Sequence, residues 1–390
     1  MTLPARFGVG TGTNFAAHFA FLGFYLPFFP LWLDSRGLSA SEIAIVLALV
    51  PLARVPISLP AGAIADALRE RAVMVAVSCG LVAIAMSAHA GADGFLAILV
   101  LHAMFAVSWV PHLPLVDAIA LTGVRRDPRV DYGRMRSWGS IAFLVTNLGG
   151  GWVLARTGPD AVLIGLIAFA WLSFAASFML PRLGRRERPP ERAVRTLLAD
   201  RPLVLVLLGA GLVQASHAVL YSFGSIHWAA KGFSGGWIGV LWAIGVIVEI
   251  ILFRALRGRT GRLGAGGLMM LGAGMGVLRW TAMSFDPGLW TTVVLQALHL
   301  GSFACCYLGQ QLFVAAHVPE RQAAGAQGLA TLTSAAAFGL ATLAAGPLYG
   351  QFGAGAYAMA AVMCAAGAAI GWAGLYPQSA GSGGQTRSPS

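Results

Sequence analysis

The stretch GFSGGWIGVLWAIGVIVEI, residues 232–250, is an apolar run in which Glu249 is the single charged side chain. A related stretch, GLSASEIAIVLALVPLARV, occupies residues 37–55, which is 195 residues earlier in a chain of 390. Both begin with glycine and place a serine two residues later. Ser39 and Glu42 form the S-x-x-E pattern of a capping box, which predicts a helix start. The spacing indicates an internal duplication of half the chain.

The repeat places Arg54 opposite Glu249, because each lies 15 residues after its serine. At 1.5 Å per helical residue, both side chains are expected about 22 Å along their helices. The two halves therefore carry opposite charges at equivalent depth.

The composition identifies the solvent around these helices. Hydrophobic residues make up 57% of the chain and charged residues 11%, with a mean hydropathy of +0.75. Soluble domains carry roughly 25% charged residues, so this chain is expected to be an integral membrane protein. Backbone groups in lipid must be satisfied internally, and runs of this length favour helices. We predict twelve spans, near residues 7–33, 40–65, 72–91, 95–121, 137–156, 160–180, 202–229, 235–254, 264–285, 288–316, 323–350 and 353–376.

The net charge of +11 is distributed unevenly between alternate loops. One set of loops holds only Arg36, Arg156 and Lys231, and the other set holds nearly all the remaining basic residues. The positive-inside rule places both termini in the cytoplasm. The charge is thus a topology signal, and we expect no nucleic-acid partner.

The predicted spans fall into two halves of six. The N-terminal half is 1–180, a cytoplasmic linker follows at 181–201, the C-terminal half is 202–376, and a disordered tail ends the chain at 377–390. A short surface helix is predicted around 193–199. The expected fold is all-α, with twelve transmembrane helices arranged as a parallel duplication of six, in the manner of the major facilitator fold.

Ionisable residues within the spans mark a transport pathway or a structural pair. The candidates are Arg54, Asp117, Glu249, Arg279, His102 and His299, with Arg134 and Arg136 at the start of the fifth span. Asp117 could instead pair structurally with Arg134 or Arg136, Arg279 could extend to the outer surface, and His102 could be a packed polar residue. His217 and His227 are ten residues apart and are interpreted as isolated.

These residue types suit the co-transport of a proton and an anion. Burial favours the protonated form of a carboxylate, so Glu249 or Asp117 can carry a proton, and His299 titrates in the useful range. Arginine matches a carboxylate ligand, which makes Arg136, Arg54 and Arg279 candidates for binding substrate. Tyr25 and Trp242 could stack on an aromatic substrate. The four cysteines lie within apolar runs and no metal site is expected.

Several motifs, in their order and spacing, resemble a known transporter group over nearly the whole chain. The residues 62–71, GAIADALRER, are similar to the degenerate signature of the major facilitator superfamily, with Gly62 and Asp66 in place. The more specific motifs are PLVDAIA around Asp117, DYGRMRSWGSIAF from Asp131, VQASHAVLYSFGSIHW from Val213, IGVLWAIGVIVEIILF from Ile238, GVLRW from Gly276 and LQALHLGSF from Leu295. Together they resemble the 3-phenylpropionate (arylpropionic acid) permease group.

The resemblance implies a multi-pass protein of the bacterial inner membrane that imports arylpropionic acids with protons. The group is distantly similar to lactose permease-type symporters, which implies roles for Glu249, Arg279 and His299. Gly62, Asp66 and Arg134 are implied to be structural or gating residues. An acidic residue expected one turn after His299 is replaced by Ser302, so Glu249 or Asp117 must carry more of the coupling. Arg136 is the expected partner of Glu249, because spans 5 and 8 face each other in this architecture.

The leading hypothesis is a proton-coupled symporter for a small, aromatic organic anion. The alternatives are proton-antiport efflux of hydrophobic compounds and a sugar- or nucleoside-type symporter. The chain is not expected to be an enzyme, since the sequence shows no clustered catalytic motif. We expect a monomer that uses the proton gradient and needs no cofactor.

Overall fold

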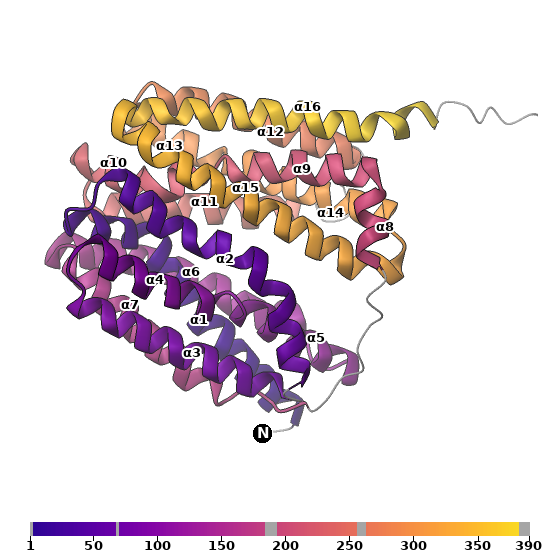
Figure 1. The fold of residues 1–390 in the computed structure, drawn as a ribbon, viewed down its shortest axis with the longest axis horizontal. Coiled ribbons are helices and arrows are strands. Elements are labelled where there is room, and N and C mark those ends of the chain that lie inside the picture. Colours follow the sequence, from indigo (N-terminus) through magenta and orange to yellow (C-terminus); the bar gives the residue numbers. More distant parts are fainter. Residues whose placement is uncertain (1–2, 68–69, 184–192, 256–262, 382–390) are drawn as a thin grey trace, which may run out of the picture. The chain divides into compact units, whose positions relative to one another are not determined.

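The computed structural model describes residues 3–67, 70–183, 193–255 and 263–381 (Figure 1). Side chains are described within these ranges, apart from those of residues 3–5, 58–67, 193–195, 253 and 376–381. Every regular element in the described ranges is helical. The predicted fold class, an all-α membrane protein, is therefore confirmed. The predicted tail and most of the central linker lie outside the described residues.

Ten helical segments of the described chain are long and apolar enough to cross a membrane. One of them, residues 320–375, contains two helices that are each long enough to span, at Ala323–Phe352 and Tyr357–Gly381, and the helix at Gly264–Ser284 lies outside these ten. The number of twelve spans stays a prediction. The chain divides into two compact units. Unit 1 comprises Met1–Arg188 and Tyr221–Ala243, and unit 2 comprises Pro189–Leu220 and Ile244–Ser390.

Unit 1 is built around its first helix, α1, whose aromatic side chains Phe15, Phe21, Phe28, Phe29 and Trp32 are fully buried. Helix α1 packs against α5, α6 and α7, and α3 packs against α4 and α7. The bounds are α1 Leu3–Ser35, α2 Ala40–Ala67, α3 Arg71–Ala88, α4 Gly94–Trp109, α5 His112–Arg126, α6 Tyr132–Thr157, α7 Asp160–Ser177 and α10 Ser225–Ala230.

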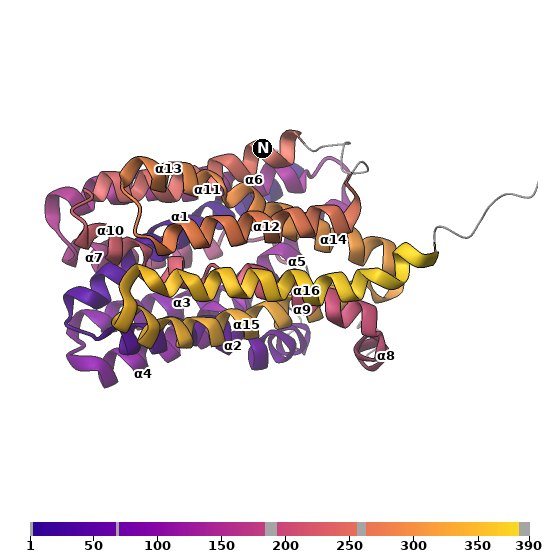
Figure 2. The same cartoon turned by 90° about the horizontal axis from the view of Figure 1, so that it is seen from above.

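Unit 2 has α9 at its centre, packed against α14, α15 and α16. Helix α12 runs along α16, and both views show the two side by side (Figure 2). The bounds are α8 Ala193–Ala199, α9 Arg201–Ala215, α12 Gly264–Ser284, α13 Leu289–Ala297, α14 Cys306–His317, α15 Ala323–Phe352 and α16 Tyr357–Gly381. The predicted short helix at 193–199 is confirmed as α8. Helix α11, Gly235–Ala255, contributes residues to both units.

The helix starts follow local hydrogen-bonding chemistry. The Ser39 amide and hydroxyl donate to Oε2 of Glu42, at 2.8 and 2.7 Å, and the Glu42 amide donates to Oγ of Ser39 at 3.4 Å. This is the predicted capping box at the start of α2. Asp131 caps α6 by accepting from the Arg134 amide, and Asp200 caps α9 by accepting from the Leu203 amide. These side chains satisfy amides that have no partner within the helix.

The backbone repeats the internal duplication. Gly37 and Gly232, which are 195 residues apart, have φ values of +75° and +81°. Gly158 and Gly353, also 195 residues apart, have φ values of +77° and +54°. A left-handed residue ends a helix without the Cβ clash that other residues suffer. A positive φ, which favours glycine, therefore occurs at equivalent positions of the two sequence repeats.

Helices α6 and α11 approach each other backbone to backbone within unit 1. A Cβ atom at Gly151 would lie 2.4 Å from the carbonyl oxygen of Gly235, and one at Gly239 would lie 2.6 Å from that of Asn147. Only glycine fits such contacts, as at many helix interfaces in membranes. The predicted fifth and eighth spans thus lie against each other over these residues.

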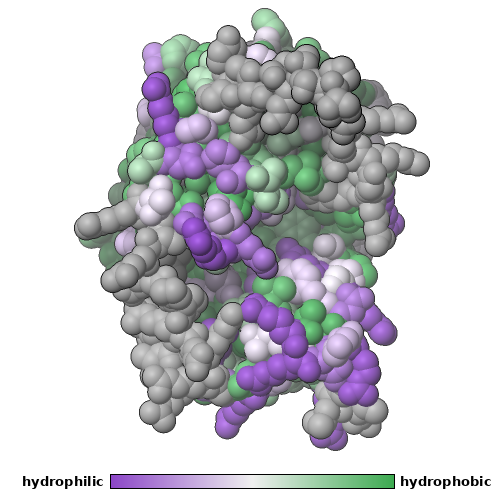
Figure 3. Space-filling model, turned by 90° about the vertical axis from the view of Figure 1, so that its right-hand side faces the viewer, coloured by the Kyte–Doolittle hydropathy of each residue, from purple (hydrophilic) through white to green (hydrophobic). Residues whose placement is uncertain are grey.

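The surface divides into apolar and polar regions. Large apolar side chains such as Leu96, Val145 and Ile164 are 70%, 61% and 68% exposed, as expected where lipid is the solvent. Figure 3 views the right-hand side of Figure 1, where α5 of unit 1 ends, and shows hydrophilic side chains on that face. After α5, the Arg129 guanidinium donates two hydrogen bonds to Asp127, at 3.0 and 2.8 Å. These bonds lower the pKa of Asp127.

Candidate substrate and proton sites

Arg136 of α6 lies against aromatic rings of α1 in unit 1. Its guanidinium carbon is 3.9 Å from the ring centroid of Phe19 and 5.6 Å from that of Phe15. Both are cation–π distances, which hold the guanidinium by its planar face. Arg136 therefore combines a fixed positive charge with an aromatic surface.

His18, one residue before Phe19, lies in a second aromatic and polar contact. Its ring stacks on Trp109 of α4, with centroids 4.2 Å apart and an interplanar angle of 7°. Nδ1 of His18 is 3.2 Å from Nδ1 of His112, and Nε2 of His112 is 3.3 Å from Oδ1 of Asn14. The Phe19 ring, which Arg136 contacts, has its centroid 5.2 Å from that of the His18 ring. Unit 1 thus brings the predicted Arg136 close to a buried histidine.

Asp117 of α5 accepts a hydrogen bond from the Tyr132 hydroxyl at 2.9 Å. The charge of Arg136 also acts on Asp117, without an ion pair between the two. Arg134 is exposed, and its amide donates to the capping Asp131 at 3.1 Å. Arg134 and Arg136 were both predicted as possible partners of Asp117. Of these two arginines, Arg136 is the one whose charge acts on Asp117.

Tyr25 and Trp242 both make hydrogen bonds inside unit 1. The Tyr25 hydroxyl is 3.0 Å from Nε2 of His102, and the Tyr25 ring is parallel to that of Phe29. Nε1 of Trp242 donates to the Ser225 hydroxyl at 2.9 Å. His102 is fully buried among aromatic rings, which agrees with its interpretation as a packed polar residue.

Arg279 of α12 is the centre of a polar cluster in unit 2. It is fully buried, and its guanidinium donates to Oε1 of Gln296 at 2.6 Å and to Oγ of Ser302 at 3.0 Å. The same Nη1 is 3.2 Å from Nδ1 of His299 and 3.4 Å from Nε2 of His217. The alternative that Arg279 extends to the outer surface is wrong, because it points into this cluster.

His217 corrects a second expectation. It was interpreted as isolated, yet its Nε2 lies 3.3 Å from the Ser302 hydroxyl and its ring is perpendicular to that of His299, at 5.1 Å. Ser302 lies in the π-helical turn Leu300–Cys305, and another π-helical turn, Leu220–Gly224, follows His217. Such turns reorient side chains and are common at functional sites.

Glu249 is half-buried in α11, in unit 2. One turn earlier, a Cβ atom at Gly245 would lie 3.4 Å from Cδ2 of His299, so α11 runs close to the Arg279 cluster there. The predicted contact between Glu249 and Arg136 joins residues of different units and stays a prediction. The prediction that Glu249 and Arg54 lie at the same depth in the membrane also stays a prediction. Gly62 and Asp66 lie outside the residues whose side chains the structure describes.

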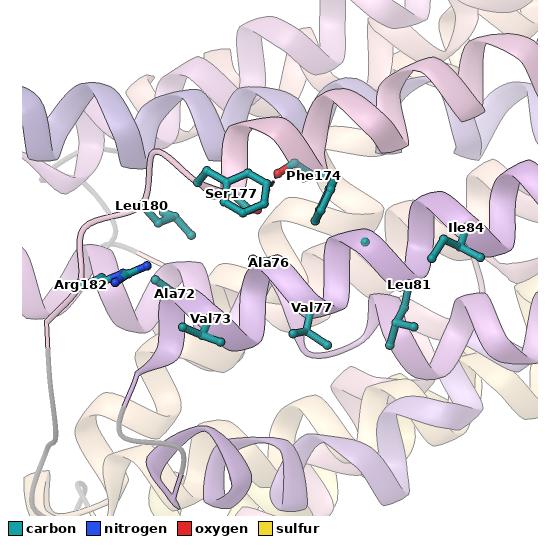
Figure 4. Close-up of a pocket in the computed structure, with 12 residues that line it drawn as sticks. Ala72, Val73, Ala76, Val77, Leu81, Ile84, Phe174, Ser177, Leu180 and Arg182 are labelled. Atoms are coloured by element: carbon teal, nitrogen blue, oxygen red, sulfur yellow. Dashed lines mark hydrogen bonds between the residues drawn. The ribbon is translucent and has the colours of Figure 1, made fainter.

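A groove lies elsewhere in unit 1, between α3 and α7 (Figure 4). It has a volume of about 490 Å³ and a mostly apolar lining that includes Val77, Leu81 and Phe174, with Arg182 at one end. Several lining side chains, among them Val77 at 56% and Ile84 at 55%, are exposed. None of the predicted site residues lines this groove, so it is separate from the candidate sites.

A comparison with models of known families identifies the family of the chain. The model of the MFS_1 like family matches residues 15–359, which include Arg136 with its aromatic contacts and the polar cluster around Arg279. The chain belongs to this family of major facilitator transporters. The resemblance seen in the sequence is thus confirmed, and the chain is a multi-pass membrane transporter rather than an enzyme.

Relatives of the chain are also transporters. It is 30% identical over 309 residues to the probable 3-phenylpropionic acid transporter of Escherichia coli (strain K12), covering 78% of this chain and 81% of the relative. It is 29% identical over 296 residues to the maltose permease of Geobacillus stearothermophilus, covering 74% of each. The crystal structure of the nucleoside transporter NupG has a TM-score of 0.79 at 16% identity, covering 96% of this chain and 99% of that one. A bacterial homologue of the human lysosomal transporter Spinster has a TM-score of 0.69 at 14% identity, with 96% of each chain covered.

Proposed function

We propose that this family member is a proton-coupled symporter for a small aromatic carboxylate, such as 3-phenylpropionate. It acts by alternating access in a bacterial inner membrane, with both termini in the cytoplasm. It works as a monomer and uses the proton gradient without a resident cofactor.

The observation that carries the proposal is the combination of charge and aromatic surface around Arg136. An arylpropionate has a carboxylate at one end and a phenyl ring at the other. The guanidinium suits the carboxylate, and the rings of Phe15 and Phe19 make its surroundings aromatic and apolar, which suits the aryl group. Arg54 of α2 is a second basic residue within the helices of unit 1. The relationship to the 3-phenylpropionic acid transporter supports the same substrate class.

The Arg279 cluster provides a second set of polar groups. Gln296, Ser302 and two histidines surround the guanidinium in unit 2. Transporters of this fold bind substrate near the midplane and between their repeats. We assign Arg279 to substrate recognition together with Arg136 and Arg54, and we assign proton carriage to Glu249, Asp117 or His299.

The decisive experiment is uptake of radiolabelled compounds by cells or proteoliposomes containing the protein. The panel contains aryl carboxylates, alkyl carboxylates, maltose and a nucleoside, each measured with and without a protonophore. Accumulation of 3-phenylpropionate that the protonophore abolishes is the expected result. Uptake of maltose or the nucleoside alone would favour the sugar- or nucleoside-type alternative, and proton-driven loss of a hydrophobic compound would favour efflux.

Glu249→Gln tests the proton-carrying role. Glutamine keeps the size of the side chain but cannot take up the proton, so we expect substrate to equilibrate across the membrane without accumulating. The measurement is the ratio of internal to external substrate under an imposed pH gradient. The matched control is Glu320→Gln, which changes an exposed glutamate in the short turn Glu320–Gln322. Accumulation by Glu249→Gln at the wild-type ratio would exclude Glu249 as the coupling group.

A further inference from the structure

The hydrogen-bonded pair His18–His112 is a group of titratable side chains that the roles assigned above do not use. We propose that this pair is a proton-binding site in unit 1 that fills when an anionic substrate binds, so that the two ligands are coupled within one unit. The inference rests on the proposed function, because it takes the anion to be a carboxylate held near Arg136.

The hydrogen bonds indicate where the additional proton goes. If Nε2 of His112 donates to Oδ1 of Asn14, then Nδ1 of the neutral His112 ring has no hydrogen and accepts from Nδ1 of His18. Nε2 of His18 then carries a lone pair, because the hydrogen bond of His18 to His112 is made through Nδ1. A proton from water can bind this nitrogen without any other bond being broken. The resulting imidazolium remains hydrogen-bonded to His112 through Nδ1.

The surroundings contain one feature that stabilises this imidazolium. The Trp109 ring lies flat against His18, with centroids 4.2 Å apart. A cation over the face of tryptophan is attracted by the ring quadrupole, more strongly when water is excluded. His18 is only 3% exposed, so the interaction is largely desolvated.

Positive charges oppose protonation until an anion arrives. The Arg136 guanidinium lies 3.9 Å from the Phe19 ring centroid, and that ring is 5.2 Å from the His18 ring, so a second positive charge at His18 is unfavourable. A bound carboxylate neutralises part of this field and makes the proton easier to bind. By thermodynamic linkage, protonation must strengthen anion binding by the same factor. The neighbouring helices contribute Cys79 of α3, whose Sγ is 3.5 Å from Nδ1 of His112, Trp109 of α4, and Arg136 of α6, which contacts Phe19 beside His18. The charge of Arg54 of α2 also acts on His18, whereas Asp117 of α5 bonds to Tyr132 and is influenced by Arg136.

The same region contains polar atoms without partners. Nδ2 of Asn14 and Oγ1 of Thr11 are buried and have no hydrogen-bond partner among the described residues. Thr11, Asn14 and His18 are spaced by three and four residues and therefore share one face of α1. Buried donors without partners are costly, which favours a ligand that occupies this face.

The experiment measures proton uptake on ligand binding by the purified full-length protein in weakly buffered detergent solution. A pH-sensitive dye reports protons and calorimetry reports the binding of 3-phenylpropionate. We expect about one proton to be taken up per bound anion, and the affinity to rise as the pH falls. In His18→Gln we expect anion binding to persist with no proton uptake and with an affinity that does not change with pH.

Two further variants distinguish the loss of a proton site from a loss of folding. Trp109→Phe keeps an aromatic ring but weakens the cation–π contact, so the pH at which affinity changes should move downward. His89→Gln changes a buried histidine whose Nδ1 bonds to the carbonyl oxygen of Ala85, and should keep wild-type proton uptake. Thermal unfolding in detergent checks that each variant is folded.

The outcomes separate the two proposals. If the wild type binds the anion without taking up a proton, or if folded His18→Gln takes up as many protons as the wild type, the His18–His112 site is wrong while anion transport stands. If Glu249→Gln abolishes proton uptake on anion binding while folded His18→Gln retains it, the proton that binds with the anion is on Glu249 and the inference is overturned. If no carboxylate of the panel binds, both the inference and the proposed function fail.

Discussion

Arg279 shows how a charged residue is accommodated inside a membrane protein. Its guanidinium donates to Gln296 and Ser302 and lies within 3.4 Å of nitrogen atoms of His217 and His299. Its carbon is also 4.3 Å from the Trp280 ring centroid. The planar fork of arginine can reach several partners in fixed directions, which an ammonium group cannot.

Arg279→Lys is therefore expected to destabilise unit 2 although the charge is kept. Each lost hydrogen bond to a charged group costs about 1.5–3 kcal/mol, so the apparent melting temperature in detergent should fall by several degrees. The control is Arg125→Lys, since Arg125 is exposed and bonds only to the nearby carbonyl oxygen of Leu121. Equal melting temperatures for the two variants would contradict the structural importance of the fork.

Individual functional residues could be predicted from the sequence more readily than the residues that they contact in the structure. Arg279 and His299 were each predicted to have a role, and the structure places Nη1 of Arg279 3.2 Å from Nδ1 of His299. His217 was interpreted as isolated because nothing in its neighbourhood along the chain shows that it meets Arg279, 62 residues away. His18 and His112 are 94 residues apart, and nothing close to either residue in the sequence predicts that they meet. The available signal was that each is a polar residue within an apolar run, which is costly unless it is paired.

At the scale of elements, glycine decides how closely helices approach. The contact between α6 and α11 places Gly151 against the backbone of Gly235. Gly149, two residues earlier on α6, has no atom within 4 Å of its Cβ position. An added methyl group would therefore clash with the α11 backbone at Gly151 but would meet no atom within 4 Å at Gly149.

Gly151→Ala should separate α6 from α11 and lower stability by about 1–3 kcal/mol, the usual cost of overpacking. Gly149→Ala should leave stability unchanged or raise it slightly, because alanine is a better helix former. Thermal unfolding of the two variants in the same detergent compares them directly. A Gly151→Ala protein as stable as Gly149→Ala would show that the helices can move apart without cost.

Element starts were predictable where the signal is local. The capping box of Ser39 and Glu42 needs only four residues, and the structure shows its hydrogen bonds. The π-helical turns at Leu220–Gly224 and Leu300–Cys305 have no comparable signature, because they depend on packing against other helices. The two turns lie in the helices that carry His217 and His299, so the irregular geometry of the site was the part that sequence could not predict.

At the scale of the whole molecule, composition and the repeat predicted the fold. Few charges in a long apolar chain leave helices as the stable form in lipid, and the family comparison confirms the major facilitator class. The division into domains stays a prediction, since contacts assign Tyr221–Ala243 to unit 1 rather than to a continuous C-terminal half. Hydropathy along the sequence predicts single helices, whereas the assignment of a helix to one compact unit or the other depends on which helices pack together.

The proposed orientation can be tested with single cysteines in exposed loops. Asp93→Cys lies between α3 and α4, and Pro128→Cys lies between α5 and α6. With cytoplasmic termini, a membrane-impermeant maleimide should label Asp93→Cys in intact cells and Pro128→Cys only after lysis. The reverse pattern would place both termini outside.

The native cysteines give that labelling a practical advantage. Cys79, Cys305, Cys306 and Cys364 are at most 2% exposed. A polar reagent that reacts with the thiolate cannot reach thiols enclosed in this way. The wild-type chain therefore supplies its own unreactive background, and reporter groups can be introduced at chosen loops without first replacing four residues of the packed interior.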